Sequence, residues 1–499
     1  MSFWSLESIK TVVGGAWLAR PEAAPAVEGL STDSRAVRPG QVFLALRGER
    51  TDGHRYLREA AAAGAALLVI DRAEAVPADL SKGAAVLLVP DAGAALLRLA
   101  GAYRRTLERT RVIAVGGSNG KTTTVRLIHA ALGGSLRGTA SAKSFNNAVG
   151  VPLTILAARR TDQYLLCEVG TNAPGEIAAL ASVVEPDVAV ITSIGREHLE
   201  GLATLRGVVQ EEASLVAALR PGGVAVVTGD SPELVETVSA LLGRGKGRDL
   251  RSVLTFGFAP EASLRITSAE ESIDGVRFTL NGRRRYALGL LGLHNASNAA
   301  AAVAVARRLG VDDAAIEAGL AGAAGPEMRL ERSTVRGVRI VNDAYNANPE
   351  STLAAISTFG AVVAATPGVG RRVLVLGDML EQGDSGPDVH REIGDAVAAA
   401  GWADLVVLVG RLSLFTADRL ARTLPASRMA IFEDLDGGRA MEVAALLRPG
   451  DAVLLKGSRG MGLERIAAAL RDGPADAIAA VRTVGPKSAS GRAGAAAAG

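Results

Sequence analysis

The sequence predicts an α/β protein of three domains, in which the central domain has a doubly wound, mostly parallel sheet. The chain has 499 residues, which suggests about three domains because one hydrophobic core rarely organises so long a chain. Short apolar runs typical of buried strands alternate with helix-like segments, as expected for parallel sheets. A glycine-rich loop ending in a lysine stands between one such strand and helix, at 117–121.

The composition is that of an ordinary globular protein, with 48% hydrophobic and 21% charged residues and a net charge of +3. No dense basic run carries interleaved aromatic residues, which argues against nucleic acid as a partner. The first residues lack the basic and apolar segments of a signal peptide, and no apolar run reaches the ~18 residues that a membrane-spanning helix needs. The one cysteine, Cys167, allows no intrachain disulfide and is expected in the core. We therefore expect a cytoplasmic enzyme.

Residues 1–107 predict a small N-terminal α/β domain. Strands are expected at 42–46 and 66–70, with a helix at 56–63 between them. Two polar patches precede these elements, Ser31–Arg35 and Asp52–His54. They are consistent with a turn and a helix cap. They are equally consistent with a polar ligand site in which Ser34 and Arg35 contact phosphate or uracil.

Residues 108–327 begin with the glycine-rich loop and form the predicted central domain. Val112–Val115 predicts a strand, and a helix is expected from Thr122 onward. Such a loop directs backbone N–H groups at a phosphate chain, with Lys121 reaching the β- and γ-phosphates and the Thr122 hydroxyl binding Mg²⁺. The general motif has a glycine where Val115 stands, so this is a shorter form of the loop. The alternative is a tight surface turn with an incidental lysine.

Two further polar residues are expected near this loop. Glu168 ends a predicted strand at 163–169, and His198 follows another at 188–192. The carboxyl ends of parallel strands share one edge of the sheet, so both side chains can converge on the loop. A glutamate that ends an apolar strand favours a metal ligand. His198 alone is equally consistent with a solvated loop histidine.

The rest of the central domain carries three recognisable segments. Asn146–Pro152 reads as a turn-rich insertion, and residues 251–286 predict β-hairpins around Asp274-Gly275 and Asn281-Gly282. Gly292–Asn298 leads into an alanine-rich helix that ends near Leu309. The asparagines of this segment suit the edge of a purine. Alternatively, Asn295 or Ser297 caps the helix.

Residues 328–472 predict a third, C-terminal α/β domain of Rossmann-like type. Strands are expected at 338–341, 373–376, 405–409 and 452–455. Polar loops follow these strands, which again predicts ligand contacts at one edge of a sheet. Residues 473–499 are rich in alanine and glycine and are expected to form a disordered tail.

These segments together resemble the Mur ligases of bacterial peptidoglycan synthesis, most closely the members that add D-alanyl-D-alanine. The matching segments occur in order over residues 27–470: Thr32–Arg35, Gly117–Thr124, Asn146–Pro152, Glu168–Gly170, Gly175–Ile177, His198–Gly201, Gly292–Asn298, Asp343–Ser351, Leu376–Glu381 and Lys456–Glu464. Asp343–Pro349 discriminates most, because members that add diaminopimelate or lysine carry a different version of it and a later Asn-Pro-Arg motif.

The resemblance implies an ATP-dependent ligase that joins D-alanyl-D-alanine to UDP-MurNAc-tripeptide through an acyl phosphate, the final cytoplasmic step of peptidoglycan precursor synthesis. It implies ATP and two Mg²⁺ ions as cofactors. We expect a monomer with no nucleic-acid partner and no membrane insertion. Three alternatives remain: a ligase that adds the third amino acid, a folylpolyglutamate synthase-like enzyme, and a non-catalytic nucleotide-binding paralogue. The third residue of the acceptor peptide is not determined by the sequence.

The resemblance also implies roles for individual residues. Nucleotide contacts are expected from Gly117, Ser118, Asn119, Gly120, Lys121, Thr122, Thr123, Asn295, Asn298, Arg329 and Asp343. Metal ligands are expected at Thr122, Glu168, His198 and Glu212, and catalytic groups at Lys121, His198, Glu212 and Lys456. Substrate contacts are expected from Ser34 and Arg35 at the UDP end, from Asn146 and Asn147, and from Tyr345, Asn346 and Asn348 around the dipeptide.

Glu212 marks a departure from the family pattern. Family members usually carry a carbamoylated lysine about fourteen residues after the histidine that corresponds to His198, and Glu212 stands there with no lysine nearby. A glutamate supplies similar anionic oxygens without CO₂. Our hypothesis is that Glu212, or alternatively Glu211, replaces the carbamate. The other interpretation is a solvated helix face with a weakened or lost second metal site.

Overall fold

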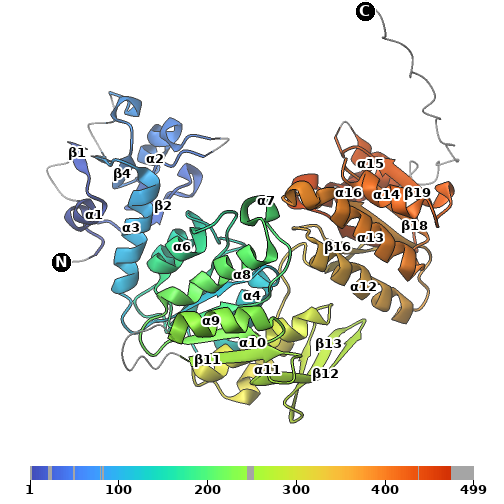
Figure 1. Cartoon of the computed structure of the whole chain (residues 1–499). Coiled ribbons are helices and arrows are strands. Elements are labelled where there is room, and N and C mark those ends of the chain that lie inside the picture. Colours follow the sequence, from blue (N-terminus) through green and yellow to red (C-terminus); the bar gives the residue numbers. More distant parts are fainter. Residues whose placement is uncertain are drawn as a thin grey trace, which may run out of the picture.

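The computed structural model describes residues 3–20, 25–48, 51–78, 80, 84–243, 252–436 and 438–473, and it contains three β-sheets that follow one another along the chain (Figure 1). The predicted α/β class with three domains is confirmed. The predicted tail at 473–499 lies outside the described residues, except for Gly473. No helix in the described part of the chain is long and apolar enough to cross a membrane.

The N-terminal sheet has five strands in the order β1-β5-β4-β3-β2, and only β1 runs antiparallel to its neighbour. The elements are α1 (Leu6–Val13), β1 (Ala16–Ala19), β2 (Leu30–Ser31), β3 (Val42–Leu44), α2 (Leu57–Ala62), β4 (Leu67–Ile70), β5 (Ala85–Leu88) and α3 (Ala92–Arg105). The expected caps are present: Asp33 accepts the N–H of Arg35, and Asp52 accepts the N–H of His54. The two polar patches are therefore capped turns.

Helix α3 joins the N-terminal sheet to the central domain. The Arg104 side chain is almost fully buried and donates to the carbonyls of Val184 and Glu185, both at 2.7 Å. The Tyr103 hydroxyl donates to the carbonyl of Ala158 at 2.7 Å. A buried guanidinium bonded to carbonyls is costly to expose, so this interface holds the first two domains firmly together.

The central sheet has nine strands in the order β14-β13-β12-β11-β10-β9-β6-β8-β7. The strands are β6 (Arg111–Gly116), β7 (Gly138–Ala140), β8 (Tyr164–Glu168), β9 (Val188–Ile191), β10 (Val224–Thr228), β11 (Ser252–Gly257), β12 (Leu264–Ser272), β13 (Gly275–Leu280) and β14 (Arg284–Leu288). Strands β7 to β12 are parallel, and the hairpins at Asp274-Gly275 and Asn281-Gly282 are present as predicted. The sheet order reverses at β6, and ligands of parallel sheets bind at such a point.

Helices cover both faces of this sheet. They are α4 (Lys121–Gly133), α5 (Gly150–Ala157), α6 (Glu176–Val184), α7 (Leu199–Leu202), α8 (Leu205–Ala213), α9 (Pro232–Gly243), α10 (His294–Arg308) and α11 (Asp313–Ala321). Successive residues of β6 point to opposite faces, so Val112 and Ala114 join the core on the α6 side while Ile113 and Val115 join the core on the α4 and α10 side. The apolar run of β6 is thus buried on both faces, and Cys167 of β8 is buried as expected.

Two local expectations in the central domain were wrong. The segment Asn146–Pro152 is not only a turn, because α5 begins at Gly150 within it. The Asn147 side chain accepts the N–H groups of Val149 and Gly150, and Pro152 lies in the first turn, where its missing N–H is tolerated. Neither Asn295 nor Ser297 caps α10, whose cap residue is Leu293 without a side-chain hydrogen bond.

The C-terminal sheet has six strands in the order β15-β16-β20-β17-β18-β19, all parallel except the edge strand β15. The elements are β15 (Glu331–Val335), β16 (Val338–Asp343), α12 (Pro349–Ala365), β17 (Arg372–Gly377), α13 (Gly386–Ala400), β18 (Leu405–Val409), α14 (Ser413–Leu420), β19 (Met429–Phe432), α15 (Arg439–Ala445), β20 (Ala452–Lys456) and α16 (Glu464–Asp472). One core lies under α12 and α13 and a second under α15 and α16, which is the predicted Rossmann-like arrangement.

Candidate functional site

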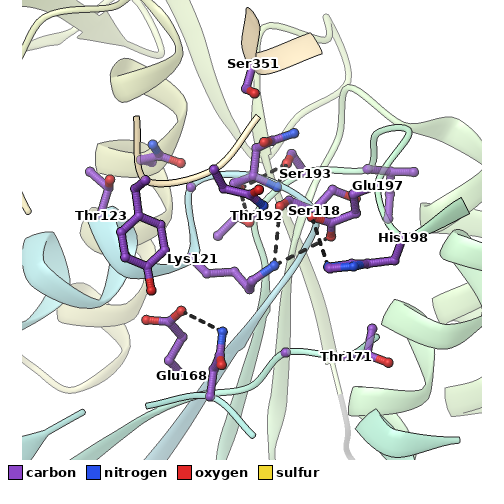
Figure 2. A pocket seen from close by; sticks show the side chains of 18 of the residues that line it. Ser118, Lys121, Thr123, Glu168, Thr171, Thr192, Ser193, Glu197, His198 and Ser351 are labelled. Carbon is purple, nitrogen blue, oxygen red and sulfur yellow. Dashed lines mark hydrogen bonds and ion pairs between the residues drawn. The ribbon is translucent and has the colours of Figure 1, made fainter. Parts of the chain in front are cut away.

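A cleft of about 810 Å³ lies between the central and C-terminal domains (Figure 2). Most of the residues predicted for the site line it: Ser118, Asn119, Gly120, Lys121, Thr123, Asn146, Asn147, Glu168, His198, Asn295, Asn298, Arg329, Asp343, Tyr345, Asn346 and Lys456. Thus residues separated by more than 300 positions in the chain meet around the loop that follows β6.

The phosphate loop requires its two glycines. Gly117 has φ 116°, and a β-carbon there would lie 2.2 Å from Thr192 Oγ1. Gly120 has φ 86°, and a β-carbon there would lie 2.3 Å from Asn298 Oδ1. Both positions therefore exclude a side chain sterically and conformationally. Helix α4 starts directly after Gly120, so its free N–H groups face the cleft, as anion binding requires.

Lys121 lies at the centre of the site. Its Nζ donates to the Gly117 carbonyl at 2.5 Å. It also lies 3.5 Å from Glu197 Oε1 (Figure 2). Burial alone would lower the pKa of Lys121, but the carboxylates of Glu197, Glu212 and Glu168 raise it above its usual value. The ammonium group is therefore charged and can stabilise a transferring phosphoryl group.

Glu168 ends β8 inside the cleft and is 1% exposed. Its Oε1 accepts hydrogen bonds from Thr122 Oγ1 at 3.1 Å and Asn146 Nδ2 at 3.2 Å. Its Oε2 is buried and has no hydrogen-bond partner among the described residues. Burial raises the pKa of Glu168, although Arg329 and Lys121 oppose the shift. A buried, unpartnered carboxylate oxygen beside a threonine hydroxyl fits a divalent cation.

His198 connects the central domain to the C-terminal domain. Its Nδ1 lies 2.7 Å from Glu381 Oε2, and its Nε2 lies 3.9 Å from Glu197 Oε2. Burial lowers the pKa of His198, but Glu381 and Glu197 raise it by more, so the net shift is upward. His198 is therefore a partnered residue of the cleft rather than a solvated loop histidine.

Glu197 was not predicted from the sequence. It is 4% exposed, lines the cleft, and its Oε1 has no hydrogen-bond partner in the part of the chain that the structure describes. Burial raises the pKa of Glu197, and Lys121 and His198 oppose that shift. The sequence feature that could have indicated Glu197 is its position directly before His198, in a loop just beyond a buried strand.

Glu212 lies beneath the phosphate loop. It is 1% exposed, and its Oε2 accepts the N–H of Gly117 at 2.6 Å. Burial raises its pKa to about 7, although Lys121 opposes this shift. The interpretation in which this helix face is solvated is wrong. The neighbouring Glu211 instead accepts the N–H groups of Gly175 and Ile177 at the start of α6, which leaves Glu212 as the candidate.

The two asparagines predicted for the adenine lie together at the start of α10. Asn298 Nδ2 donates to Asn295 Oδ1 at 2.8 Å, and Asn295 Nδ2 donates to the Leu291 carbonyl at 2.7 Å. The Thr124 hydroxyl donates to Asn298 Oδ1 at 3.3 Å. These bonds hold the Asn298 amide beside Gly120, and both asparagines line the cleft.

Two cations of the C-terminal domain face the phosphate loop across the cleft. The Arg329 guanidinium carbon lies 4.4 Å from the centre of the Tyr345 ring, and its Nη2 donates to Thr122 Oγ1 at 3.2 Å. Lys456 Nζ lies 2.7 Å from Asp343 Oδ2 and donates to the Asn346 carbonyl at 2.9 Å. Both cations are held in place by neighbouring groups, which suits recognition of a phosphate chain.

Three residues predicted for substrate contacts do not line the cleft. Asn348 caps α12 by accepting the N–H of Ser351, and its Nδ2 donates to Asn119 Oδ1 at 3.0 Å. Ser34 and Arg35 lie in the N-terminal domain, where the exposed Arg35 pairs with Asp33 at 2.7 Å. Asn348 is thus a contact between two domains, and any role of Ser34 and Arg35 belongs to the N-terminal domain.

The donor set offers a clear site for one magnesium ion. Within the described residues, no group of three or more His, Cys, Asp or Glu side chains is arranged to hold a metal. Thr122 and Glu168 offer a hydroxyl and a free carboxylate oxygen, and Mg²⁺ commonly takes few protein ligands beside phosphate and water. Of the predicted ligands of a second ion, His198 lines the cleft, whereas Glu212 lies beneath the phosphate loop and has a buried Oε1 with no hydrogen-bond partner among the described residues.

Three family models match the chain. They are the Mur ligase family catalytic domain at residues 26–104, the Mur ligase middle domain at 115–306, and the Mur ligase glutamate ligase domain at 328–459. Their order and positions follow the three sheets.

Curated relatives match over nearly their whole length. The UDP-N-acetylmuramoyl-tripeptide–D-alanyl-D-alanine ligase of Bacillus subtilis is 36% identical over 94% of this chain and 99% of its own. The protein of the same name from Escherichia coli is 32% identical over 89% of this chain and 94% of its own.

Solved structures agree in fold. A MurF crystal structure from Acinetobacter baumannii has a TM-score of 0.79 and 28% identity, covering 94% of this chain and 99% of that chain. MurF ligase from Thermotoga maritima in complex with ADP has a TM-score of 0.72 and 26% identity, and the match covers 89% of this chain and 97% of that chain.

Proposed function

Since this chain belongs to the Mur ligase family, we propose that its cleft joins D-alanyl-D-alanine to a UDP-MurNAc-tripeptide at the expense of ATP. It is an ATP-dependent, ADP-forming ligase of peptidoglycan precursor synthesis. The observation that carries the proposal is the position of Lys121, which lies among three buried glutamates in a loop facing Arg329 and Lys456. Such a site binds the phosphates of ATP and stabilises their transfer.

The reaction must activate a carboxylate before an amide can form. The terminal carboxylate of the tripeptide attacks the γ-phosphorus of ATP, the bond to the β-phosphate oxygen breaks, and ADP leaves. Both reacting groups are anionic, so the charged Lys121 is needed to lower the repulsion between them. The backbone N–H groups at the start of α4 cradle the phosphates.

The second step forms the amide. The amine of D-alanyl-D-alanine attacks the carbonyl carbon of the acyl phosphate, the resulting tetrahedral intermediate loses phosphate, and the proton of the amine passes to the departing phosphate. Tyr345 and Asn346, which line the C-terminal side of the cleft, are the proposed contacts of the dipeptide. A closed cleft keeps water from the acyl phosphate, whose hydrolysis would waste ATP.

Magnesium is part of the proposal. Thr122 and Glu168 would hold an ion that offsets the charge of the phosphates, since Glu168 has a free, buried oxygen beside the threonine hydroxyl. We retain His198 and Glu212 as candidate ligands of a second ion, with Glu212 in place of the carbamoylated lysine of the family. Restoring lysine in Glu212→Lys should then make activity depend on bicarbonate. Normal turnover of Glu212→Ala would contradict this role.

The remaining assignments complete the proposal. Ser34 and Arg35 of the N-terminal domain bind the UDP end, and Asn146 and Asn147 contact the acceptor beside Glu168. Asn295 and Asn298 bind adenine, while Asp343 contacts the ribose or phosphates. The three domains end near residues 107, 327 and 472. The protein is a cytoplasmic monomer.

The test is phosphate release with a panel of UDP-MurNAc-tripeptides, each with and without D-alanyl-D-alanine. Release that requires ATP, the tripeptide and the dipeptide together supports the proposal, and the panel identifies the third residue of the acceptor. Activity with a single amino acid on a shorter acceptor, or with glutamate on a folate, would assign another Mur-type ligase. Nucleotide binding without phosphate release would assign a non-catalytic paralogue. Lys121→Ala is the control for contaminating ATPase.

A further inference from the structure

We propose that Arg196 is a positioning residue that couples closure of the C-terminal domain to the phosphate loop. Arg196 belongs to the central domain, in the loop after β9, but its partners lie in the C-terminal domain. The predicted effect of Arg196 on catalysis rests on the proposed function, whereas its predicted effect on domain closure does not. The coupling itself is a structural relation between two domains.

The C-terminal domain holds both the side chain and the backbone of Arg196. Nη1 and Nη2 donate to the two carboxylate oxygens of Glu392 on α13, at 2.8 and 3.0 Å. Nε donates to Glu350 Oε1 on α12 at 2.7 Å, and the backbone N–H donates to Glu350 Oε2 at 3.0 Å. The Gln382 side chain donates to the Arg196 carbonyl at 3.4 Å. Such a fork of two carboxylates fixes the guanidinium in one orientation.

The residues on either side of Arg196 contact the phosphate loop. Gly195 donates its N–H to Ser118 Oγ at 2.9 Å, and Ser118 Oγ lies 3.3 Å from the Gly195 carbonyl. Glu197 Oε1 lies 3.5 Å from Lys121 Nζ. A displacement of Arg196 therefore moves the counter-ion of Lys121 and the support of Ser118. The catalytic lysine depends on the position of a helix in another domain.

The start of α12 makes the same connection from the other side. Asn348, its cap residue, donates to Asn119 of the phosphate loop at 3.0 Å, and Glu350 follows two residues later. Tyr345 and Asn346, the proposed dipeptide contacts, precede them in the same segment. One short segment thus carries the proposed amine-binding residues, a phosphate-loop contact and one half of the Arg196 ion pair. Closure brings all three into place together.

The exposure of these groups suits a contact that forms and breaks. The side chains of Arg196, Glu350 and Glu392 are 33%, 39% and 41% exposed. Ion pairs at such sites are weak and are screened by salt. Arg104, which joins the first two domains, is by contrast 1% exposed. The protein therefore has one firm interface and one reversible interface. In Figure 1, helix α7, which follows Arg196 closely in the chain, lies beside the C-terminal domain.

The test compares Arg196→Ala with a matched control, Arg419→Ala. Arg419 makes an equally short forked ion pair with Asp395 and is 30% exposed, but both partners lie inside the C-terminal domain. Arg196→Ala should lower kcat about 100-fold, because misplacing a catalytic group by about 1 Å has an effect of this size. Its KM for ATP should change by less than about threefold, since the nucleotide contacts are intact. Arg419→Ala should keep the kcat and the KM for ATP of the wild type.

Three further measurements separate positioning from a general loss of structure. The wild-type kcat should fall between 0.05 and 0.5 M NaCl, as roughly expected for a screened ion pair, and Arg196→Ala should lose this dependence. Arg196→Lys should recover part of kcat, since an ammonium can pair with one glutamate. Fluorescence energy transfer between labels on the N-terminal and C-terminal domains should show closure by ATP in the wild type and reduced closure in Arg196→Ala.

Equal closure and a kcat within about twofold of the wild type in Arg196→Ala would overturn the inference. The same loss in Arg419→Ala would also overturn it, because the effect would then not be specific to the domain contact. If no variant, including the wild type, forms the amide product, the proposed function fails. The energy-transfer measurement still decides whether Arg196 controls closure.

Discussion

Glu212 Oε2 accepts the backbone N–H of Gly117 at 2.6 Å, although 95 residues separate them in the sequence. The bond joins α8 to the first glycine of the phosphate loop, and Glu212 itself does not line the cleft. Because Gly117 also has a positive φ and no room for a side chain, this carboxylate supports the loop at its most constrained residue.

Replacing Glu212 by glutamine should change how stability depends on pH. The pKa of Glu212 is raised from 4.5 to about 7 in the folded protein, so between these values the folded chain binds a proton that the unfolded chain lacks. Stability therefore falls as pH rises through this window, by about 3 kcal/mol for this group. Glu212→Gln keeps an acceptor for Gly117 and should lose this fall. Denaturant unfolding at pH 5 and pH 8 in EDTA measures the difference, and equal pH dependence in both proteins would refute it.

Replacing Lys121 by alanine should abolish most activity. The variant lacks the charge that offsets two anions in the transfer step, and loss of one such group lowers kcat by about 1000-fold. Phosphate release under saturating substrates measures the effect. Lys10→Ala on α1 is the control, because Lys10 lies in the N-terminal domain away from the cleft. A Lys121→Ala variant with half of the wild-type rate would rule out this role.

Replacing Glu168 by glutamine should weaken the binding of magnesium. The amide keeps the contact with Thr122 but removes the free, charged oxygen. The Mg²⁺ concentration for half-maximal activity should rise about 10- to 100-fold, and calorimetric titration with Mg²⁺ and a non-hydrolysable ATP analogue should show weaker binding. Glu233→Gln on the exposed side of α9 serves as the control. An unchanged titration would exclude Glu168 as a ligand.

Replacing Lys456 by methionine should destabilise the C-terminal domain. Lys456 is 3% exposed and pairs with Asp343 at 2.7 Å, so its removal leaves the Asp343 carboxylate, which is 14% exposed, without its cation. Such a loss costs about 3–5 kcal/mol, as measured by denaturant unfolding. The double variant with Asp343→Asn should recover part of this loss. Arg391→Ala, which breaks an exposed pair with Asp388, should cost less than about 1 kcal/mol. Additive effects of Lys456→Met and Asp343→Asn would contradict the pairing.

Much of the fold was predictable because buried parallel strands have a strong local signal. The strand at 405–409 was predicted with the bounds that the structure has, and β6, β8 and β17 differ from their predicted bounds by one residue at each end. Helix α5 was missed because asparagines and a proline indicate a turn locally, whereas here the Asn147 side chain accepts the N–H groups of Val149 and Gly150 and Pro152 lies in the first turn of the helix. Glu197 and Arg196 were missed because their partners lie in other segments and, for Arg196, in another domain.

By itself the sequence determined the α/β class, the phosphate loop, the family resemblance and most residues that line the cleft. These follow from short-range patterns: apolar runs, glycines at constrained positions, and polar residues just beyond strand ends. Only the tertiary structure decided the roles of Glu211 and Glu212. Adjacent helical residues point about 100° apart. Glu211 therefore caps α6, while Glu212 supports the phosphate loop. That difference depends on which segments pack beside α8, which no local pattern of the sequence contains.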